Sequence, residues 1–208
     1  MKKSTIITII VAVAIIIIGG FLACKYSLVS NWMGKNTEEN TQGNIETADW
    51  KTYRNEEYGF EIKYPNDWHF GMAKSNSPIF NFSKESTDVS IPQHSGATLI
   101  SILPNGVPTE GASGQSKKVT EDLTKASEGN VMEFYLTNSQ TWGYYINFND
   151  APESWEDYGF VWAGVKIENL QMKEIPTETY SQFIKSGNIN EADLQMIKKI
   201  LSTFKFTK

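Results

Sequence analysis

An uncharged apolar segment at the N-terminus constrains this chain more than any other feature. Residues 4–24 contain no charged side chain, and residues 6–23 are apolar apart from Thr8. That length is close to the ~20 residues that a helix needs to cross a bilayer, and a helix satisfies its own backbone polar groups inside lipid. Because Lys2 and Lys3 precede the segment, the positive-inside rule leaves the N-terminus in the cytoplasm. We therefore expect a membrane anchor or signal followed by an extracytoplasmic chain.

Three fates of residues 1–24 stay open. The segment can remain as an uncleaved single-pass transmembrane helix, because it is longer than the about 7–15 apolar residues that are usual in a signal peptide. It can instead be a lipoprotein signal, because Leu22-Ala23-Cys24 is similar to the end of a lipobox, whose cysteine is lipidated. It can also be cleaved and the chain released. Cys24 is the only cysteine of the chain, which excludes an intramolecular disulfide and a CxxC redox pair.

Residues 25–47 predict a flexible stalk. Asn, Thr, Glu and Gly dominate this stretch without any helical or strand period, and such a composition buries too little apolar surface to order itself. Residues 1–47 hold four lysines and three glutamates, a net charge of +1, so the rest of the chain carries −5 − 1 = −6. An acidic domain has no electrostatic footprint for nucleic acid, and we expect no nucleic-acid partner.

Residues 48–208 are long enough to bury one hydrophobic core and are rich in strand patterns. Phe60, Ile62 and Tyr64 alternate with charged residues, which is typical of a half-buried strand. Asn138-Ser139-Gln140 separates two such segments and predicts a hairpin. The predicted strands are 50–53, 60–64, 68–73, 79–82, 97–103, 131–137, 141–148, 158–167 and 203–207.

Three helices are expected. Asn190 is a good N-cap with Asp193 at the capping-box position, and an apolar stripe follows to residue 204. Residues 177–186 and 116–128 have shorter apolar stripes, and a glycine follows each of them. Strands at hairpin spacing with segregated helices indicate an α+β fold with a mainly antiparallel sheet.

Two aromatic-rich patterns frame the globular part. The first is Trp50-x-x-Tyr53-x-Asn55-x-x-Tyr58-Gly59-Phe60-x-Ile62-x-Tyr64-Pro65-x-x-Trp68, and the second is Ile197-x-x-Ile200-Leu201-Ser202-Thr203-Phe204-x-Phe206. Together they resemble the PsbP-like family, named for an extrinsic subunit of photosystem II, which has membrane-anchored and lipoprotein bacterial relatives. The resemblance implies an α/β/α sandwich around a central, mainly antiparallel sheet over residues 48–208. It carries over no catalytic residue, because the motifs contain none.

Metal-binding patterns are sparse. Of the two histidines, His94 lies in a turn-rich stretch, and Asp67-x-His69 is the only close pair with an acidic residue. The densest acidic patch consists of Asp150, Glu153, Glu156 and Asp157. Clustered carboxylates suit Ca²⁺ or another divalent cation, but the spacing does not fit an EF-hand. The patch is therefore either a solvated loop or a weak cation site, and the PsbP-like resemblance adds an association with manganese and calcium.

Aromatic residues offer a second candidate surface. Alternation over residues 141–148 places Trp142, Tyr144, Ile146 and Phe148 on one face, which predicts a core-facing strand. Tyr145 and Trp155 remain as candidates for an exposed ligand-stacking surface.

The sequence favours a binding role over catalysis. The chain has no GxGxxG or GxxxxGK[ST] phosphate loop, and Gly111-Ala112-Ser113-Gly114-Gln115 lacks the final glycine of a GxSxG elbow. We expect a non-catalytic, membrane-tethered extracytoplasmic domain that binds or stabilises an envelope protein complex. The alternatives are a cell-surface module for carbohydrate or another small ligand, and a hydrolase whose site is assembled from distant residues.

Overall fold

The computed structural model describes residues 47–73, 78–85, 96–106, 114–176 and 181–207. The chain divides into two compact units, Met1–Ile45 and Glu46–Lys208, and the described residues all belong to the second. The predicted anchor with Cys24, most of the predicted stalk and His94 lie outside the described residues. Within the described residues, no helix is both long and apolar enough to cross a membrane.

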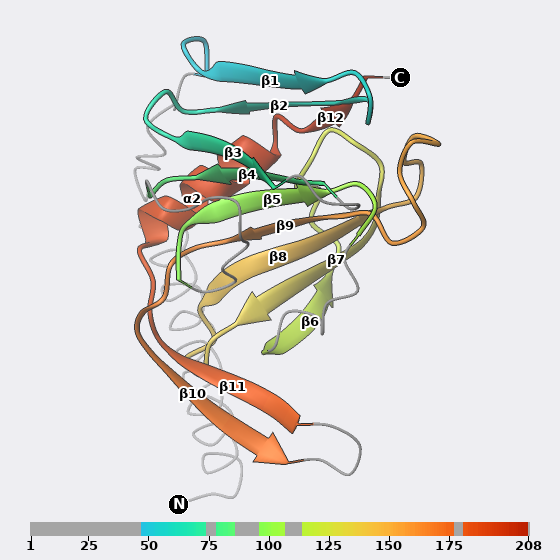
Figure 1. Ribbon diagram of the computed structural model, residues 1–208. Helices are drawn as coiled ribbons and strands as arrows, with labels where there is room; N and C mark the ends of the chain where they lie inside the picture. The colour runs from blue at the N-terminus through green and yellow to red at the C-terminus, as the bar shows by residue number, and fades with distance from the viewer. Residues whose placement is uncertain (1–46, 74–77, 86–95, 107–113, 177–180, 208) are drawn as a thin grey trace, which may run out of the picture. The chain divides into compact units, whose positions relative to one another are not determined.

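A seven-stranded antiparallel sheet forms the body of the unit, in the order β3-β4-β5-β9-β8-β7-β6 (Figure 1). Its strands are β3 (His69–Ala73), β4 (Ile79–Ser83), β5 (Leu99–Leu103), β6 (Gln115–Val119), β7 (Glu128–Tyr135), β8 (Thr141–Phe148) and β9 (Phe160–Gly164). Every residue of the central strands β5 and β9 is buried, whereas β3 and β6 contain no buried residue. The centre of the sheet is therefore buried on both faces, and its edge strands are more exposed.

A smaller sheet and one helix pack against the large sheet. Strands β1 (Lys51–Asn55), β2 (Phe60–Tyr64) and β12 (Lys205–Phe206) form the small sheet in the order β1-β2-β12. Helix α2 (Glu191–Leu201) contacts β2, β8 and β9 and lies behind the large sheet in Figure 1. The main core lies between these layers. In it, the Phe60 ring stacks on Phe204 at 5.9 Å and meets Phe80 edge-on at 5.4 Å.

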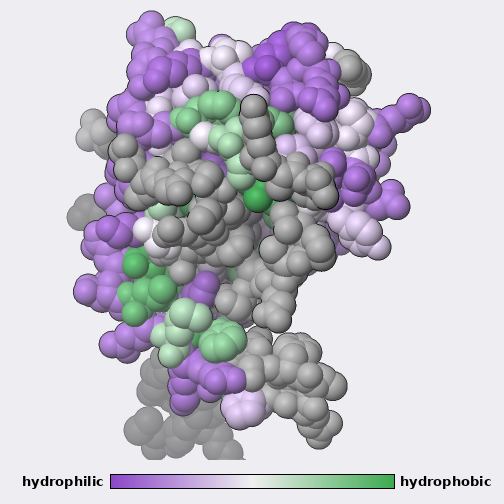
Figure 2. All heavy atoms as spheres, in the orientation of Figure 1, coloured by the Kyte–Doolittle hydropathy of each residue, from purple (hydrophilic) through white to green (hydrophobic). Residues whose placement is uncertain are grey.

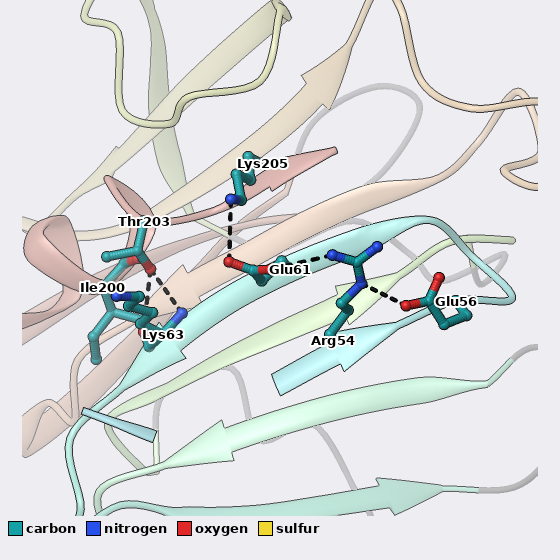
Figure 3. A network of polar contacts seen from close by, with 7 residues as sticks. All are labelled: Arg54, Glu56, Glu61, Lys63, Ile200, Thr203 and Lys205. Carbon is teal, nitrogen blue, oxygen red and sulfur yellow. Dashed lines mark hydrogen bonds and ion pairs between the residues drawn. The ribbon is translucent and has the colours of Figure 1, made fainter. Parts of the chain in front are cut away.

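Polar contacts tie the small sheet to α2 (Figure 3). Thr203 Oγ1 accepts a hydrogen bond from the Lys63 backbone N–H at 2.9 Å and donates one to the Ile200 carbonyl at 2.7 Å. The Glu61 carboxylate lies between Lys205 Nζ at 3.2 Å and an Arg54 guanidinium nitrogen at 3.8 Å. These contacts link all three strands of the small sheet to one another and to the end of the helix.

A two-stranded ribbon extends from the body. It consists of β10 (Glu168–Pro176) and β11 (Ser181–Asn188), and the Thr137 N–H donates to the Lys185 carbonyl at 3.1 Å where the ribbon meets the body. A two-stranded ribbon alone is marginally stable in water, so contacts of this kind stabilise it.

The expected α/β/α sandwich is wrong. The described residues form twelve strands and a single helix, so no second helical layer covers the large sheet. Of the residues 116–128, predicted as a helix, the first four belong to β6, which pairs with β7, and Leu123 is buried in an irregular segment. Of the residues 177–186, the described part belongs to β11, which pairs with β10. In both segments, pairing with the strand next to it in the chain overrides helix periodicity.

The third predicted helix is confirmed. Asn190 caps α2, and its side chain accepts a hydrogen bond from the Ala192 N–H at 3.0 Å. The Asp193 carboxylate does not complete a capping box, because it pairs with Lys84 Nζ at 2.6 Å. The predicted strands at 60–64, 79–82, 97–103 and 141–148 all occur, as does the hairpin turn, where Ser139 has φ of 67°.

Candidate functional site

The two aromatic candidates lie in packed positions. The Trp155 side chain is only 6% exposed, and its Nε1–H donates to the Tyr58 carbonyl at 2.8 Å. Its ring meets Phe206 edge-on at 5.2 Å, so the indole has no solvent-facing surface on which a sugar could stack. Tyr145 is half-buried, with its ring 4.8 Å from Phe160, and burial raises the pKa of its hydroxyl. Trp155 is thus part of the hydrophobic core.

The acidic candidates lie on the surface between β8 and β9. Asp150, Glu153, Glu156 and Asp157 are all exposed. Among the described residues, no three His, Cys, Asp or Glu side chains come together in a way that could hold a metal ion. Asp67 and His69 are also exposed, in a turn and on β3 respectively. A divalent cation site stays a prediction that no geometry in the described part supports.

A hollow of about 210 Å³ lies where β6 leaves the sheet and β7 begins. Glu128 lines it, and a carboxylate oxygen of Glu128 accepts a hydrogen bond from the Thr124 N–H at 2.5 Å. Burial raises the pKa of this carboxyl group. One carboxylate oxygen of Glu128 therefore accepts a hydrogen bond from the local backbone and is not free for a ligand.

Strand β3 is an open edge of the large sheet. Among the described strands it hydrogen-bonds only with β4, so its other side is not paired in the sheet. Its sequence is His-Phe-Gly-Met-Ala, without lysine, arginine, acidic residue or proline. Phe70 and Met72 are each 38% exposed, and Figure 2 shows hydrophobic surface at the end of the sheet where β3 lies. We call this strand and its outward side the β3 edge.

Strand β6 forms the opposite edge and is built differently. Its sequence is Gln-Ser-Lys-Lys-Val, with both lysines exposed. Lys117 Nζ pairs with the Glu133 carboxylate of β7 at 3.0 Å, while Lys118 has no ion pair within the described residues. Charged side chains on an edge oppose the addition of another strand, because pairing would desolvate them. We call this strand and its outward side the β6 edge.

The register connects the two edges residue by residue. Gly71 and Lys118 stand at opposite ends of one row that crosses all seven strands. The row consists of Gly71, Asn81, Ser101, Trp162, Tyr145, Met132 and Lys118. The two ends are thus equivalent in backbone position and differ in side-chain chemistry. An unprotected edge can accept an extended segment of another chain through main-chain hydrogen bonds.

Lys185 is an unexpected buried cation. It is 3% exposed, and its Nζ lies 4.2 Å from the centre of the Trp142 ring. Burial lowers its pKa to about 8, and no carboxylate of the described residues pairs with it. Trp142 itself is fully buried, and its indole N–H has no hydrogen-bond acceptor within the described residues. Together with the Thr137 hydrogen bond, this contact joins β11 to the body.

The open β3 edge and the buried Lys185 could be predicted from the sequence only in part. Residues 68–73 were expected to form a strand, but whether a strand lies at an edge depends on its partners, which local sequence does not contain. The absence of charge in β3 was the available clue. Lys185 was assigned to a helix, where a lysine would be solvated, so its burial had no signal.

No family model matches the chain, and neither a curated protein nor a solved structure matches it significantly.

Proposed function

We propose that this chain is a membrane-tethered, extracytoplasmic and non-catalytic module that binds an envelope protein through the β3 edge. The observation that carries the proposal is the contrast between the two edges of one sheet. The β6 edge presents two exposed lysines, whereas the β3 edge presents Phe70 and Met72 and no charge. Binding consists of strand addition, in which main-chain hydrogen bonds give affinity and side-chain contacts give specificity.

The side chains of the β3 edge fit this role. Phe70 already packs against Tyr53 of β1, with ring centroids 4.5 Å apart, so its position is fixed by the small sheet. An added strand would extend the apolar surface that Phe70 and Met72 begin. Natural sheets protect exposed edges with lysine, proline or bulges, and β3 has no proline, no lysine and no break in its register with β4.

The predicted anchor is the basis for the proposed extracytoplasmic location of the domain. An uncharged segment preceded by Lys2 and Lys3 orients the following chain to the outside of the membrane. The predicted stalk of residues 25–47 gives the domain the reach to meet a partner that is held in or near the same membrane.

Site-specific photo-crosslinking in cells tests the proposal. The full chain would carry p-benzoylphenylalanine in place of Met72, and a matched chain would carry it in place of Lys118 on the β6 edge. The proposal predicts a defined crosslinked product for position 72 and none for position 118, with the partner identified by mass spectrometry. Equal labelling from both positions, or no product from position 72, would overturn it.

A further inference from the structure

We infer that the strand that pairs with the β3 edge is β3 of a second copy of this chain. This inference rests on the proposed function, because it names the partner of the same edge. The two β3 strands run antiparallel about a two-fold axis through Gly71, and the two seven-stranded sheets become one continuous sheet. Such an interface is isologous, since each copy contributes the same residues.

The order of side chains in β3 is self-complementary in this arrangement. A two-fold axis at Gly71 places Phe70 opposite Met72 of the partner subunit, and Met72 opposite Phe70 of the partner subunit. Directly opposed residues of an antiparallel pair interact, and a thioether packs favourably against an aromatic ring. On the other face, the central pair consists of two glycines, which allows close approach. The apolar side chains that are half-exposed in one copy therefore cover each other in two.

Charge favours self-pairing at this edge and opposes it at the other. No residue of β3 carries a formal charge when His69 is neutral, so two copies bring no like charges into register. The same operation about the central residue of β6 would place Lys117 directly opposite Lys117 of a second copy. Like charges directly opposite each other destabilise a strand pair. Each copy then has one edge that can pair and one edge that its lysines protect, so the assembly stops at two copies.

The membrane tether makes a small interface sufficient. Two five-residue strands bury less surface than a standard stable interface of about 1,600 Å², so the pair is weak in dilute solution. Confinement of both copies to one membrane raises their effective concentration without any new contact. The predicted anchor and the open edge thus act together.

A single-cysteine crosslinking experiment tests the inference. In an antiparallel pair, facing Cα atoms lie about 4.5–5.5 Å apart, within the range of about 4.4–6.8 Å that a disulfide spans. The variant Gly71→Cys would be made in the full chain with Cys24→Ser, reconstituted in lipid vesicles and mildly oxidised. The matched control is Ser116→Cys, an exposed serine of the β6 edge, in the same background.

The inference predicts a disulfide-linked dimer for Gly71→Cys that exceeds that of Ser116→Cys about ten-fold or more, because pairing holds the two thiols at a raised effective concentration. Equal dimer yields from the two variants would overturn it. Thermal unfolding of both variants confirms that each is folded. Met72→Lys added to Gly71→Cys provides a second readout, because it adds a charge to the edge and should lower the dimer yield about ten-fold without unfolding the domain.

The photo-crosslinking at Met72 separates failure of the inference from failure of the proposed function. A product that contains only this chain supports both. A product with a different envelope protein, together with no preferential Gly71→Cys dimer, overturns the second-copy inference and leaves the proposed function standing. No product at Met72 and no preferential dimer overturns both.

Discussion

The two edges of the large sheet have the same backbone role and opposite surfaces. Both strands have five residues, both pair with one neighbour among the described strands, and one register row ends at Gly71 on one side and Lys118 on the other. The β6 edge places two ammonium groups where a further strand would have to pair, and the β3 edge places two apolar side chains there. We therefore propose that side chains, and not the backbone, decide which edge of this sheet accepts another chain.

Removing the protection of the β6 edge should have the largest effect. In the double variant Lys117→Gln/Lys118→Val, the glutamine can still donate to Glu133, and the valine replaces the charge of Lys118 with an apolar side chain. A molecule with two open edges can add copies at both, and we expect open-ended assemblies in place of a closed pair. Light scattering over a concentration series measures this growth. Assemblies that stop at the same size as the wild type would contradict the protective role of the two lysines.

Lys185 can be compared with the exposed lysines of the β6 edge, because its ammonium group is buried and not solvated. Its pKa of about 8 lies below the ordinary value of 10.5. Between these two pKa values the unfolded chain therefore binds more protons than the folded protein. The free energy of unfolding should therefore rise as pH increases through that window and lack this contribution below about pH 8. A pKa shift of one unit corresponds to about 1.4 kcal/mol, and the contact with Trp142 offsets roughly 1 kcal/mol of the cost of burying the charge. Lys185→Met should therefore stabilise the domain by about 2 kcal/mol at pH 7.

Chemical denaturation at pH 7, 8, 9 and 9.5 measures the difference between Lys185→Met and the wild type. The difference should shrink as pH rises, since the wild type loses the buried charge. Lys118→Met is the matched control, because an exposed lysine should leave the stability unchanged at every pH. A constant difference between Lys185→Met and the wild type would show that Lys185 is not perturbed by burial.

Placing a charge in the β3 edge should weaken association without weakening the fold. Met72→Lys puts a solvated ammonium group opposite an apolar side chain, and we expect self-association to fall by about ten-fold, which corresponds to about 1.4 kcal/mol. The free energy of unfolding should change by less than about 0.5 kcal/mol, as for other exposed positions. Sedimentation equilibrium of the full chain in detergent measures the first quantity. Met72→Leu retains the apolar surface and should associate like the wild type.

The smallest expected effect lies away from both edges. Thr203→Val keeps the shape of the side chain but removes the hydroxyl that bonds Lys63 and Ile200. Loss of these bonds should lower the free energy of unfolding by about 1 kcal/mol. Self-association of the folded protein should not change, because Lys63, Ile200 and Thr203 belong to neither edge of the large sheet. A parallel loss of association would show that the edges depend on this junction.

Much of the sheet could be predicted from local sequence. Alternating apolar residues marked β2 and β8, and Asn190 with the stripe after it marked α2, because these signals depend on neighbours along the chain. The segments 116–128 and 177–186 were predicted as helices. There, Val119 meets Val131 and Ile184 meets Lys173, and such cross-strand partners have no local sequence signature.

The candidate site was less predictable than the fold. Trp155 looked like an exposed aromatic in an acidic loop, but it is buried against Phe60 and Phe206, which come from distant parts of the chain. The β3 edge was visible only as a strand, because its open side results from the strand order of the whole sheet. The sequence already shows that residues 69–73 lack lysine and acidic residues and that residues 115–119 contain two lysines. Only the strand order shows that these segments are the two edges of one sheet.

Amide hydrogen exchange of the full chain at two surface densities in vesicles tests the central claim most directly. The outward-facing backbone N–H groups of β3 have no partner strand among those described, and pairing would protect them from exchange. The account predicts that exchange in residues 69–73 slows as the density of the chain in the membrane rises, while exchange in residues 115–119 stays the same. Equal behaviour of the two edges, or no change in β3, would contradict it.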